Sequence, residues 1–291
     1  MKKSIVLALT LVMAVATIGC SASKNETVSE TTEVSNEAVA ETANEAVATE
    51  ESEAKGIYKD ILDKGEIVIA MEGTWAPWTY HNENDELVGY DVEVGTLVAE
   101  KLGVTPVFVE GEWDGLLAGL DAGRYDIMVN GVDITEERAE KYDFSTPYAY
   151  NKTAIIVSDA DTAITKPEDL EGKTTANTIS STYAQVAEKY GATVTPVDDL
   201  NQTFELLKAG RIDATLNAEV TFYDYKKEHE DAPVKIACLD YESTSVAIPM
   251  KKTEGSDELK AAIDKALEEL AAEGKLTELS NKYFGVDISK N

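Results

Sequence analysis

Two segments of this 291-residue chain follow one plan, and that repetition constrains the fold more than any other feature. "WDGLLAGLDAGRYDIMVNG" at 113–131 and "NQTFELLKAGRIDATLNAE" at 201–219 each read as a helix, an Ala-Gly-Arg turn, an aromatic or Ile residue, an Asp and a strand. Around them, short β-rich runs alternate with segments of helical period, which is typical of an α/β fold built on mainly parallel sheets. The sequence therefore predicts two α/β lobes, each with one copy of this unit.

The end of the chain is predicted to return to the first lobe. After the second copy come "SVAIPM" and the amphipathic helix "SDELKAAIDKALEELAAEG". We therefore expect 56–150 and 243–291 to form lobe 1 and 151–242 to form lobe 2, with crossover strands near 149–152 and 242–246. Ligands of such folds bind at the carboxyl ends of the strands, so the cleft is expected between the lobes.

The N-terminal part of the chain differs in composition from the rest. Residues 1–19 have a lysine pair and an apolar run too short to span a bilayer comfortably, as an export signal does. "TIGC" resembles a bacterial lipobox, which predicts a lipid on Cys20 and anchoring to the outer face of the cell membrane. Thr17 stands where leucine is usual, and an ordinary cysteine near a signal-peptidase site is the alternative. The composition of residues 20–55 predicts an acidic, disordered tether, and a weak helix is the alternative.

Charge and metal-binding residue types narrow the function classes. The formal charge of −29 argues against nucleic acid as a partner, because binding to phosphates needs Lys and Arg. Once Cys20 carries a lipid, Cys238 stands alone and no internal disulfide is available. His81 and His229 lie far apart without a cysteine partner, and no phosphate-binding or dinucleotide motif is present. We therefore expect no metal and no cofactor.

Several motifs in order identify a family. "GYDVEV", "EWDGLLAGLDAGRYDI", "NGVDITEERAEKYDFSTPY", "LEGKT" and "GKLTELSNKYFG" together resemble the solute-binding proteins of family 3, which deliver polar amino acids to ABC importers. The resemblance covers nearly everything after Lys55. "EGTWAPWTYHNENDELVGYDVEV" is most similar to cystine-binding members, with glutamine-binding members next. The resemblance implies a two-lobe, type II periplasmic-binding-protein fold, a free amino acid as ligand and permease subunits as partners. We expect a monomer.

Arg138 is an unusual residue in its place. Thr135 is a plausible N-cap, and a cation in the first helical turn opposes the helix dipole, where glutamate would complete a capping box. A surface ion pair is the ordinary role of an arginine. At a cleft, however, the planar guanidinium matches a carboxylate. The resemblance implies that Arg138 binds the α-carboxylate of the ligand.

The expected partner for the α-ammonium is missing. Family members commonly have Thr or Ser where this chain has Asp133, and Asp where it has Ala218. A zwitterion taken out of water needs both charges paired. Our hypothesis is that Asp133 replaces the missing carboxylate, with Glu219 as a weaker candidate. The alternative is that Asp133 only caps a turn.

Residues of lobe 1 are predicted to contact the ligand side chain. The resemblance implies that Trp75 and Trp113 flank it, while Trp78 packs behind them. Taken alone, a tryptophan is more often a core residue. Glu72 matches a position that meets the distal polar group, which favours glutamine, cystine or a basic amino acid over glutamate or aspartate. Gly131 is a further predicted contact.

A loop of lobe 2 is predicted to complete the site. "NTISSTYAQV" matches a loop that leads into a helix, where backbone N–H groups and a hydroxyl help to hold the carboxylate. Thr182 is the predicted backbone contact, with Ser181 beside it and Thr178 nearby. Ser180 stands where glycine is usual.

Three functions compete on this sequence. A binding protein would close its two lobes on an amino acid and present it to a permease. A dehydratase on the same fold would need a general acid or base, for which Glu72 and Asp133 are the visible candidates. An amino-acid-sensing domain would act with a separate receptor. We favour the binding protein and expect no catalytic residues.

Overall fold

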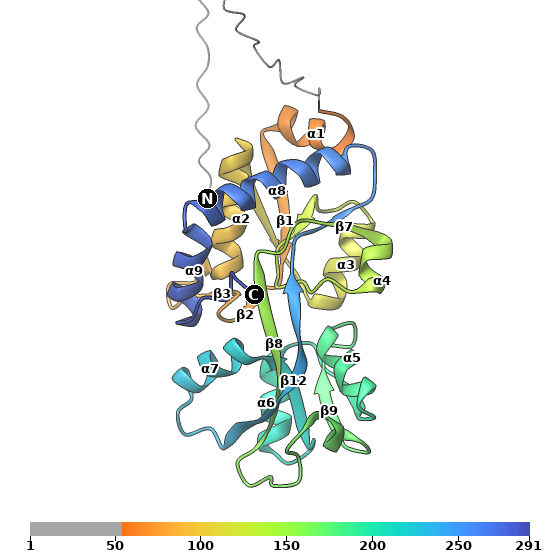
Figure 1. The fold of residues 1–291 in the computed structure, drawn as a ribbon, viewed down its shortest axis with the longest axis vertical. Coiled ribbons are helices and arrows are strands. Elements are labelled where there is room, and N and C mark those ends of the chain that lie inside the picture. Colours follow the sequence, from red (N-terminus) through yellow and green to blue (C-terminus); the bar gives the residue numbers. More distant parts are fainter. Residues whose placement is uncertain (1–53) are drawn as a thin grey trace, which may run out of the picture. The chain divides into compact units, whose positions relative to one another are not determined.

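Two five-stranded sheets carry the fold of residues 54–291, the part of the chain that this computed structural model describes (Figure 1). The first sheet has the order β5-β1-β6-β13-β7, with β1 parallel to β5 and β6 and with β13 antiparallel to β6 and β7. Its strands are β1 (Glu66–Met71), β5 (Thr105–Glu110), β6 (Ile127–Met128), β7 (Tyr142–Phe144) and β13 (Pro249–Lys251). The predicted signal peptide, Cys20 and most of the predicted tether lie outside the described residues.

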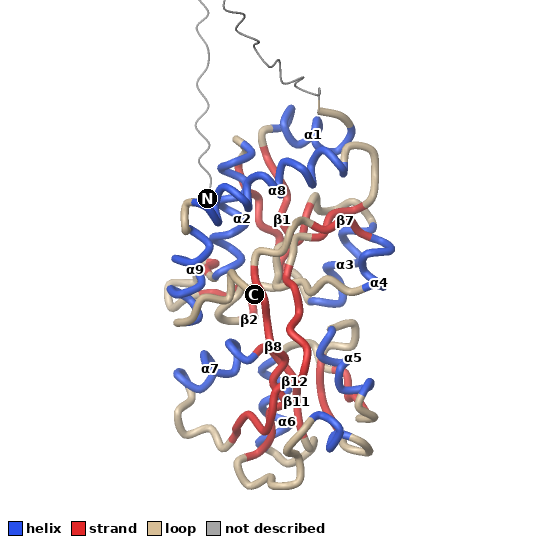
Figure 2. The backbone as a smooth tube through the Cα atoms, viewed as in Figure 1, coloured by secondary structure: helices blue, strands red, loops and turns tan. Residues whose placement is uncertain are grey.

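The second sheet has the order β10-β9-β11-β8-β12. Its strands are β8 (Ala149–Ser158), β9 (Thr174–Asn177), β10 (Thr193–Pro196), β11 (Ala214–Ala218) and β12 (Val234–Val246). β8 and β12 pair antiparallel from Ser158 and Val234 to Ala149 and Val246, and both lead from one sheet to the other (Figure 2). The predicted crossovers lie on these two strands, while the exact division of the chain into lobe segments stays a prediction.

Helices cover both sheets and define the two lobes. Lobe 1 is the first sheet with a small sheet and six helices: β2 (Thr74–Trp75), β3 (Thr79–His81), β4 (Leu87–Val88), α1 (Gly56–Lys64), α2 (Tyr90–Leu102), α3 (Trp113–Asp121), α4 (Glu136–Lys141), α8 (Ser256–Ala272) and α9 (Lys275–Phe284). Lobe 2 is the second sheet with the 3-10 turn η1 (Pro167–Leu170) and with α5 (Thr182–Lys189), α6 (Leu200–Lys208) and α7 (Glu219–Glu228).

Helix α8 is amphipathic, as its sequence predicts. Its residues Leu259, Ile263 and Leu267 recur every four residues and are buried.

The repeated sequence unit forms the same structure in both lobes. Gly123 after α3 and Gly210 after α6 adopt left-handed backbone angles, with φ of 69° and 65°, which glycine adopts without strain. The Asp that follows then binds the neighbouring parallel strand. Asp126 Oδ2 accepts from the Val68 N–H at 2.7 Å, and Asp213 Oδ2 accepts from the Thr174 N–H at 2.7 Å. Each Asp thus fixes its strand beside the adjacent one, which explains why the two segments share it.

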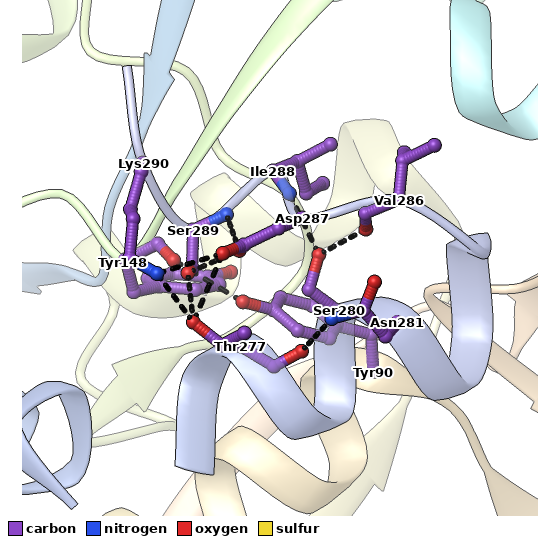
Figure 3. A network of polar contacts seen from close by, with 10 residues as sticks. All are labelled: Tyr90, Tyr148, Thr277, Ser280, Asn281, Val286, Asp287, Ile288, Ser289 and Lys290. Atoms are coloured by element: carbon purple, nitrogen blue, oxygen red, sulfur yellow. Dashed lines mark hydrogen bonds and ion pairs between the residues drawn. The ribbon is translucent and has the colours of Figure 1, made fainter. Parts of the chain in front are cut away.

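The C-terminal segment packs back onto the start of a crossover strand (Figure 3). Ser280 Oγ in α9 accepts from the Ile288 N–H at 2.7 Å, which turns the chain after the helix. The Ile288 carbonyl then accepts from the N–H of Tyr150 in β8 at 2.7 Å. Beside this contact, the Tyr90 hydroxyl donates to the Tyr148 carbonyl at 3.1 Å. The start of β8 and the residue just before it are therefore held by two different parts of lobe 1.

A buried carboxylate lies beneath the cleft. Asp91 is fully buried; its Oδ1 accepts from the Tyr148 hydroxyl at 2.8 Å and its Oδ2 accepts from the Gly131 N–H at 2.6 Å. Burial raises the pKa of Asp91 to about 7, although both hydrogen bonds act to lower it. Asp91 thereby connects the core of lobe 1 to Gly131, a predicted ligand contact.

Removing the Tyr148 hydroxyl is expected to destabilise the protein. A Tyr148→Phe variant leaves the Asp91 Oδ1 atom buried without its donor, which costs about 1–3 kcal/mol of unfolding free energy. Urea denaturation measures the loss. Tyr241→Phe is the matched control, because Tyr241 is 68% exposed and its hydroxyl contacts the exposed Glu168. Equal stability of the two variants would contradict a structural role for the Tyr148 hydroxyl.

Candidate functional site

A cavity between the lobes has an empty volume of about 560 Å³, part of it open to solvent. Lobe 1 lines it through residues at the ends of β1, β2 and β6 and in α3 and α4, and lobe 2 lines it through the ends of β9 and β11 and the starts of α5 and α6. The lining residues are Glu72, Thr74, Trp75, Trp113, Gly131, Asp133, Arg138, Asn177, Thr178, Ser181, Thr182, Tyr183, Asp199, Leu200, Thr203 and Asn217.

Most residues that the sequence singles out lie around this cavity. They are Glu72, Trp75, Trp113, Gly131, Asp133, Arg138, Thr178, Ser181 and Thr182. Glu219 does not line the cavity; it begins α7, and its Oε1 accepts from the Tyr223 hydroxyl one turn further on, at 3.1 Å. Gly131 has a φ of 55°, and a Cβ there would lie 2.6 Å from the Trp75 ring. Glycine is therefore required where the chain passes this ring.

Arg138 is held at the cavity by backbone oxygens of both lobes. Thr135 caps α4 as predicted, because its hydroxyl accepts from the Arg138 N–H at 3.1 Å. The guanidinium donates through one terminal nitrogen to the Asp133 carbonyl and through the other to the Ser180 carbonyl, each at 3.0 Å. Its central carbon lies 5.3 Å from the centre of the Trp113 ring. Since a guanidinium has five N–H donors, others remain for a ligand.

Asp133 is buried beside Arg138, with 3% of its surface exposed. Its Oδ2 accepts from the Thr182 hydroxyl of lobe 2, and its backbone pairs with Val246 of the crossover strand β12. Burial raises the pKa of Asp133, against the lowering effect of the Thr182 hydroxyl, of the nearby Thr244 hydroxyl and of Arg138. The Thr244 hydroxyl does not reach hydrogen-bonding geometry with any described residue. The carboxylate therefore lies where both lobes and a crossover strand meet.

Three lining residues have buried polar atoms without a hydrogen-bond partner among the described residues. They are the Trp113 Nε1 donor and the acceptors Asp133 Oδ1 and Asn177 Oδ1. Buried polar groups in native proteins are almost always paired, by protein, water or ligand. A ligand that brings both acceptors and donors would satisfy these atoms.

Glu72 lies at another part of the cavity wall. Its backbone N–H donates to Asn130 Oδ1, and Asn130 Nδ2 donates to Glu72 Oε2, each at 2.8 Å. Burial raises the pKa of Glu72 to about 7, and the charges of Asp199 and Asp114 add to this effect. A positively charged ligand group next to Glu72, or a proton on its carboxylate, would therefore be favourable.

Two tryptophans connect the lobes. Trp75 and Trp78 stack with ring centres 5.3 Å apart and 14° between their planes. The indole N–H of Trp75 donates to Asn217 Oδ1 at 3.2 Å, and that of Trp78 donates to the Thr221 hydroxyl at 3.1 Å. Trp78 is fully buried and absent from the cavity wall, as its predicted packing role requires.

Sequence reasoning missed several lining residues of lobe 2, among them Asn177, Asn217 and Asp199. Asn177 ends β9 and Asn217 lies next to the end of β11. Because ligands lie at the carboxyl ends of such strands, the positions of Asn177 and Asn217 were the available signal.

Within 54–291, no helix is long and apolar enough to cross a membrane, and no group of three His, Cys, Asp or Glu residues is placed to hold a metal.

Comparison with known proteins identifies the family. The model of the bacterial extracellular solute-binding proteins, family 3, matches residues 67–286. The L-cystine-binding protein TcyA of Bacillus subtilis is 37% identical over 235 residues, which cover 80% of this chain and 87% of the relative. A probable amino-acid ABC transporter-binding protein of Haemophilus influenzae is 38% identical over 224 residues, which cover 77% and 86%.

Solved structures have the same fold. An ancestral arginine-binding protein bound to arginine matches 76% of this chain and 99% of its own, with a TM-score of 0.71 and 34% identity. The unliganded, open L-cystine solute receptor of Neisseria gonorrhoeae matches 81% and 100%, with a TM-score of 0.56 and 39% identity. The predicted two-lobe, type II periplasmic-binding-protein fold is thereby confirmed. The chain belongs to the bacterial extracellular solute-binding proteins, family 3.

Proposed function

We propose that this protein captures a polar amino acid by closing its lobes and delivers it to the permease of an ABC importer. The observation that carries the proposal is that Arg138 and Asp133, both buried, line one cavity, whose wall has polar atoms without hydrogen-bond partners among the described residues. A carboxylate and an ammonium leaving water together need one partner of each charge. The site has both within five residues of the chain.

In this proposal each group of the ligand has its own partner. The free donors of Arg138 bind the α-carboxylate, supported by Thr182, Ser181 and Thr178 at the start of α5. Asp133 Oδ1 accepts from the α-ammonium; neither this atom nor the nearby Thr244 hydroxyl has a hydrogen-bond partner within bonding geometry among the described residues.

The side chain of the ligand then lies between aromatic rings. Trp75 and Trp113 both line the cavity wall, and in this proposal they flank the ligand side chain while Glu72 meets its distal group. Glu219 takes no part, because it does not line the cavity. A cystine or glutamine-like side chain is the sequence-based choice, and the cystine relatives support it.

Contacts between the lobes support closure as the binding step. Trp75 with Asn217, Thr182 with Asp133, and Arg138 with Ser180 all join one lobe to the other. The chain also superposes better on the arginine-bound relative than on the open receptor, although identity to the open receptor is higher. Both observations favour a closed arrangement of the described residues.

Anchoring and assembly are further parts of the proposal. We propose that lipid on Cys20 holds the protein at the outer face of the cell membrane, and that it works as a monomer. Mass spectrometry of the mature N-terminus tests the first statement, and light scattering tests the second. An unmodified Cys20, or a stable dimer, would contradict the corresponding statement.

An amino-acid panel tests the function itself. A ligand at about a hundred times its dissociation constant adds about 2.7 kcal/mol to the unfolding free energy, so the true ligand is expected to raise the melting temperature. It is also expected to change tryptophan emission, because Trp75 and Trp113 line the cavity. No thermal or fluorescence response to any common amino acid or to cystine would refute amino-acid capture.

One relative keeps the enzymatic alternative in view. An ancestral amino-acid-binding protein described as a precursor of cyclohexadienyl dehydratase matches with a TM-score of 0.70 and 25% identity. Glu72 and Asp133 would be the acid and base of such an activity. Recovery of the ligand unchanged after incubation favours binding alone, whereas a dehydrated product would favour the enzyme. If the amino acid acts on cells through this protein in a way that needs a separate receptor and not the permease, the amino-acid-sensing domain would be favoured.

A further inference from the structure

A second hollow joins the cavity at Glu72, Thr74 and Asp199, which line both. Every charged side chain on the wall of this hollow is acidic: Glu72, Glu110, Glu112, Asp198 and Asp199. The first three come from lobe 1 and the last two from lobe 2. We call this second hollow the acidic mouth, because its charged side chains are all acidic and it shares part of its wall with the cavity.

Asp199 is the lobe 2 carboxylate common to the cavity and the acidic mouth. It caps α6: its Oδ1 accepts from the Gln202 N–H at 3.0 Å, and its Oδ2 accepts from Gln202 Nε2 at 3.1 Å. A carboxylate has about four acceptor positions, so these two bonds leave room for a further donor. No ion pair of Asp199 with a basic side chain is found among residues 54–291.

The carboxylate of Asp199 acts on Glu72 across the cleft. Glu72 belongs to lobe 1 and Asp199 to lobe 2, and the Asp199 charge contributes to the raised pKa of Glu72. Arg138 is the basic residue of the cavity wall, and Asp133 lies next to it. Among the described residues, one acidic-mouth carboxylate has a basic neighbour: Glu110, whose Oε2 lies 2.8 Å from His81 Nε2. Glu72 and Asp199 are thus left without a basic partner.

Like charges from opposite lobes oppose closure. Two carboxylates in one poorly solvated site repel each other, and a cation between them reverses the sign of that interaction. An amide at the far end of a ligand would supply hydrogen bonds but no compensating charge. A positively charged far end would satisfy both carboxylates and connect both lobes, and the acidic mouth would attract it during approach.

We propose that Asp199, acting with Glu72, makes this protein select an amino acid whose far end carries a positive charge. The inference rests on the proposed amino-acid capture, and it replaces the sequence-based choice of a cystine or glutamine-like side chain with a cationic one. The side chains of arginine and lysine have this chemistry, and so does the far ammonium of cystine. The second carboxylate of cystine would meet an acidic wall, so we favour a basic amino acid over cystine.

Calorimetric titration of the purified protein with L-arginine, L-lysine, L-glutamine and L-cystine tests the proposal. The key variant is Asp199→Asn, because Asn caps helices as well as Asp does: it keeps one oxygen for the Gln202 N–H, removes the charge and replaces the other oxygen with an NH2 group. We expect arginine or lysine to bind at least about tenfold more tightly than glutamine. Asp199→Asn should weaken the binding of arginine or lysine by about tenfold or more, and the binding of glutamine by less than about twofold.

The matched control is Asp257→Asn, which neutralises an exposed carboxylate in the first turn of α8 that lines neither the cavity nor the acidic mouth. It should leave all affinities within about twofold. Asp199→Ser, a second capping residue, guards against a folding defect, and its melting temperature is compared with that of the parent.

The outcomes distinguish selection of a cationic side chain from amino-acid capture in general. If cystine binds most tightly and Asp199→Asn weakens it, the selected cation is the far ammonium of cystine. A preference for glutamine, equal losses for glutamine and arginine, or no loss at all would overturn the inference while leaving amino-acid capture intact. If no amino acid binds the unmodified protein, the proposed function fails as well.

Discussion

Replacing Arg138 with glutamine is expected to weaken amino-acid binding by about a hundredfold or more. Removing one partner of a buried, hydrogen-bonded charge pair costs about 2–5 kcal/mol, and each 1.4 kcal/mol is about a factor of ten in affinity. The loss should be similar for every amino acid that binds, because the α-carboxylate is common to all. Arg138→Lys should recover only part of it, since an ammonium cannot bind a carboxylate as a planar fork. Calorimetric titration measures both variants.

The chain provides a matched control for Arg138. Arg211 is an exposed arginine in the turn between α6 and β11, so Arg211→Gln changes the same charge away from the cavity. It should leave affinity unchanged. Because Arg138 also binds the carbonyls of Asp133 and Ser180, the folded state of each variant is checked by denaturation. Full affinity in a folded Arg138→Gln variant would remove the arginine from the proposed site.

Local sequence patterns predicted the fold because they are made of local contacts and periodicities. The Ala-Gly-Arg turns needed a left-handed glycine, and Asp126 and Asp213 each bind the first part of a neighbouring strand. A helix, a turn and a strand then follow within about twenty residues. The two copies could therefore be recognised as one structural unit before their place in the two sheets was known.

The cavity wall was less predictable because closure of the lobes determines it. The position of Asn217 near the end of a strand was a local signal, but its bond to Trp75, 142 residues earlier in the chain, has none. Glu219, in contrast, was predicted to contact the ligand but does not line the cavity. It follows Ala218, where relatives commonly have Asp, but it begins α7 and contacts Tyr223 instead. A shift of one residue at a helix start changes the direction of a side chain by about 100°, so sequence proximity was a weak guide.

The opposite effects of one substitution on stability and on affinity give the sharpest test of Asp133. In Asp133→Asn the size of the side chain is kept and the buried charge is removed. The ligand-free protein should be as stable as the parent or more stable, because an incompletely paired buried carboxylate is unfavourable. Amino-acid affinity should fall by about tenfold to a hundredfold, because the α-ammonium loses its charged partner.

The matched substitution Asp213→Asn should produce the reverse pattern. Asp213 lies at the repeated turn, and hydrogen bonds from Thr174 lower its pKa, so its ionised form supports the fold. The Asn variant should lose about 1 kcal/mol of unfolding free energy and keep its affinity. Titration and urea denaturation of both variants give the four values needed. If Asp133→Asn bound amino acids as tightly as the parent, or lost stability and affinity together, Asp133 would be a structural residue of the crossover and the ammonium would have another acceptor.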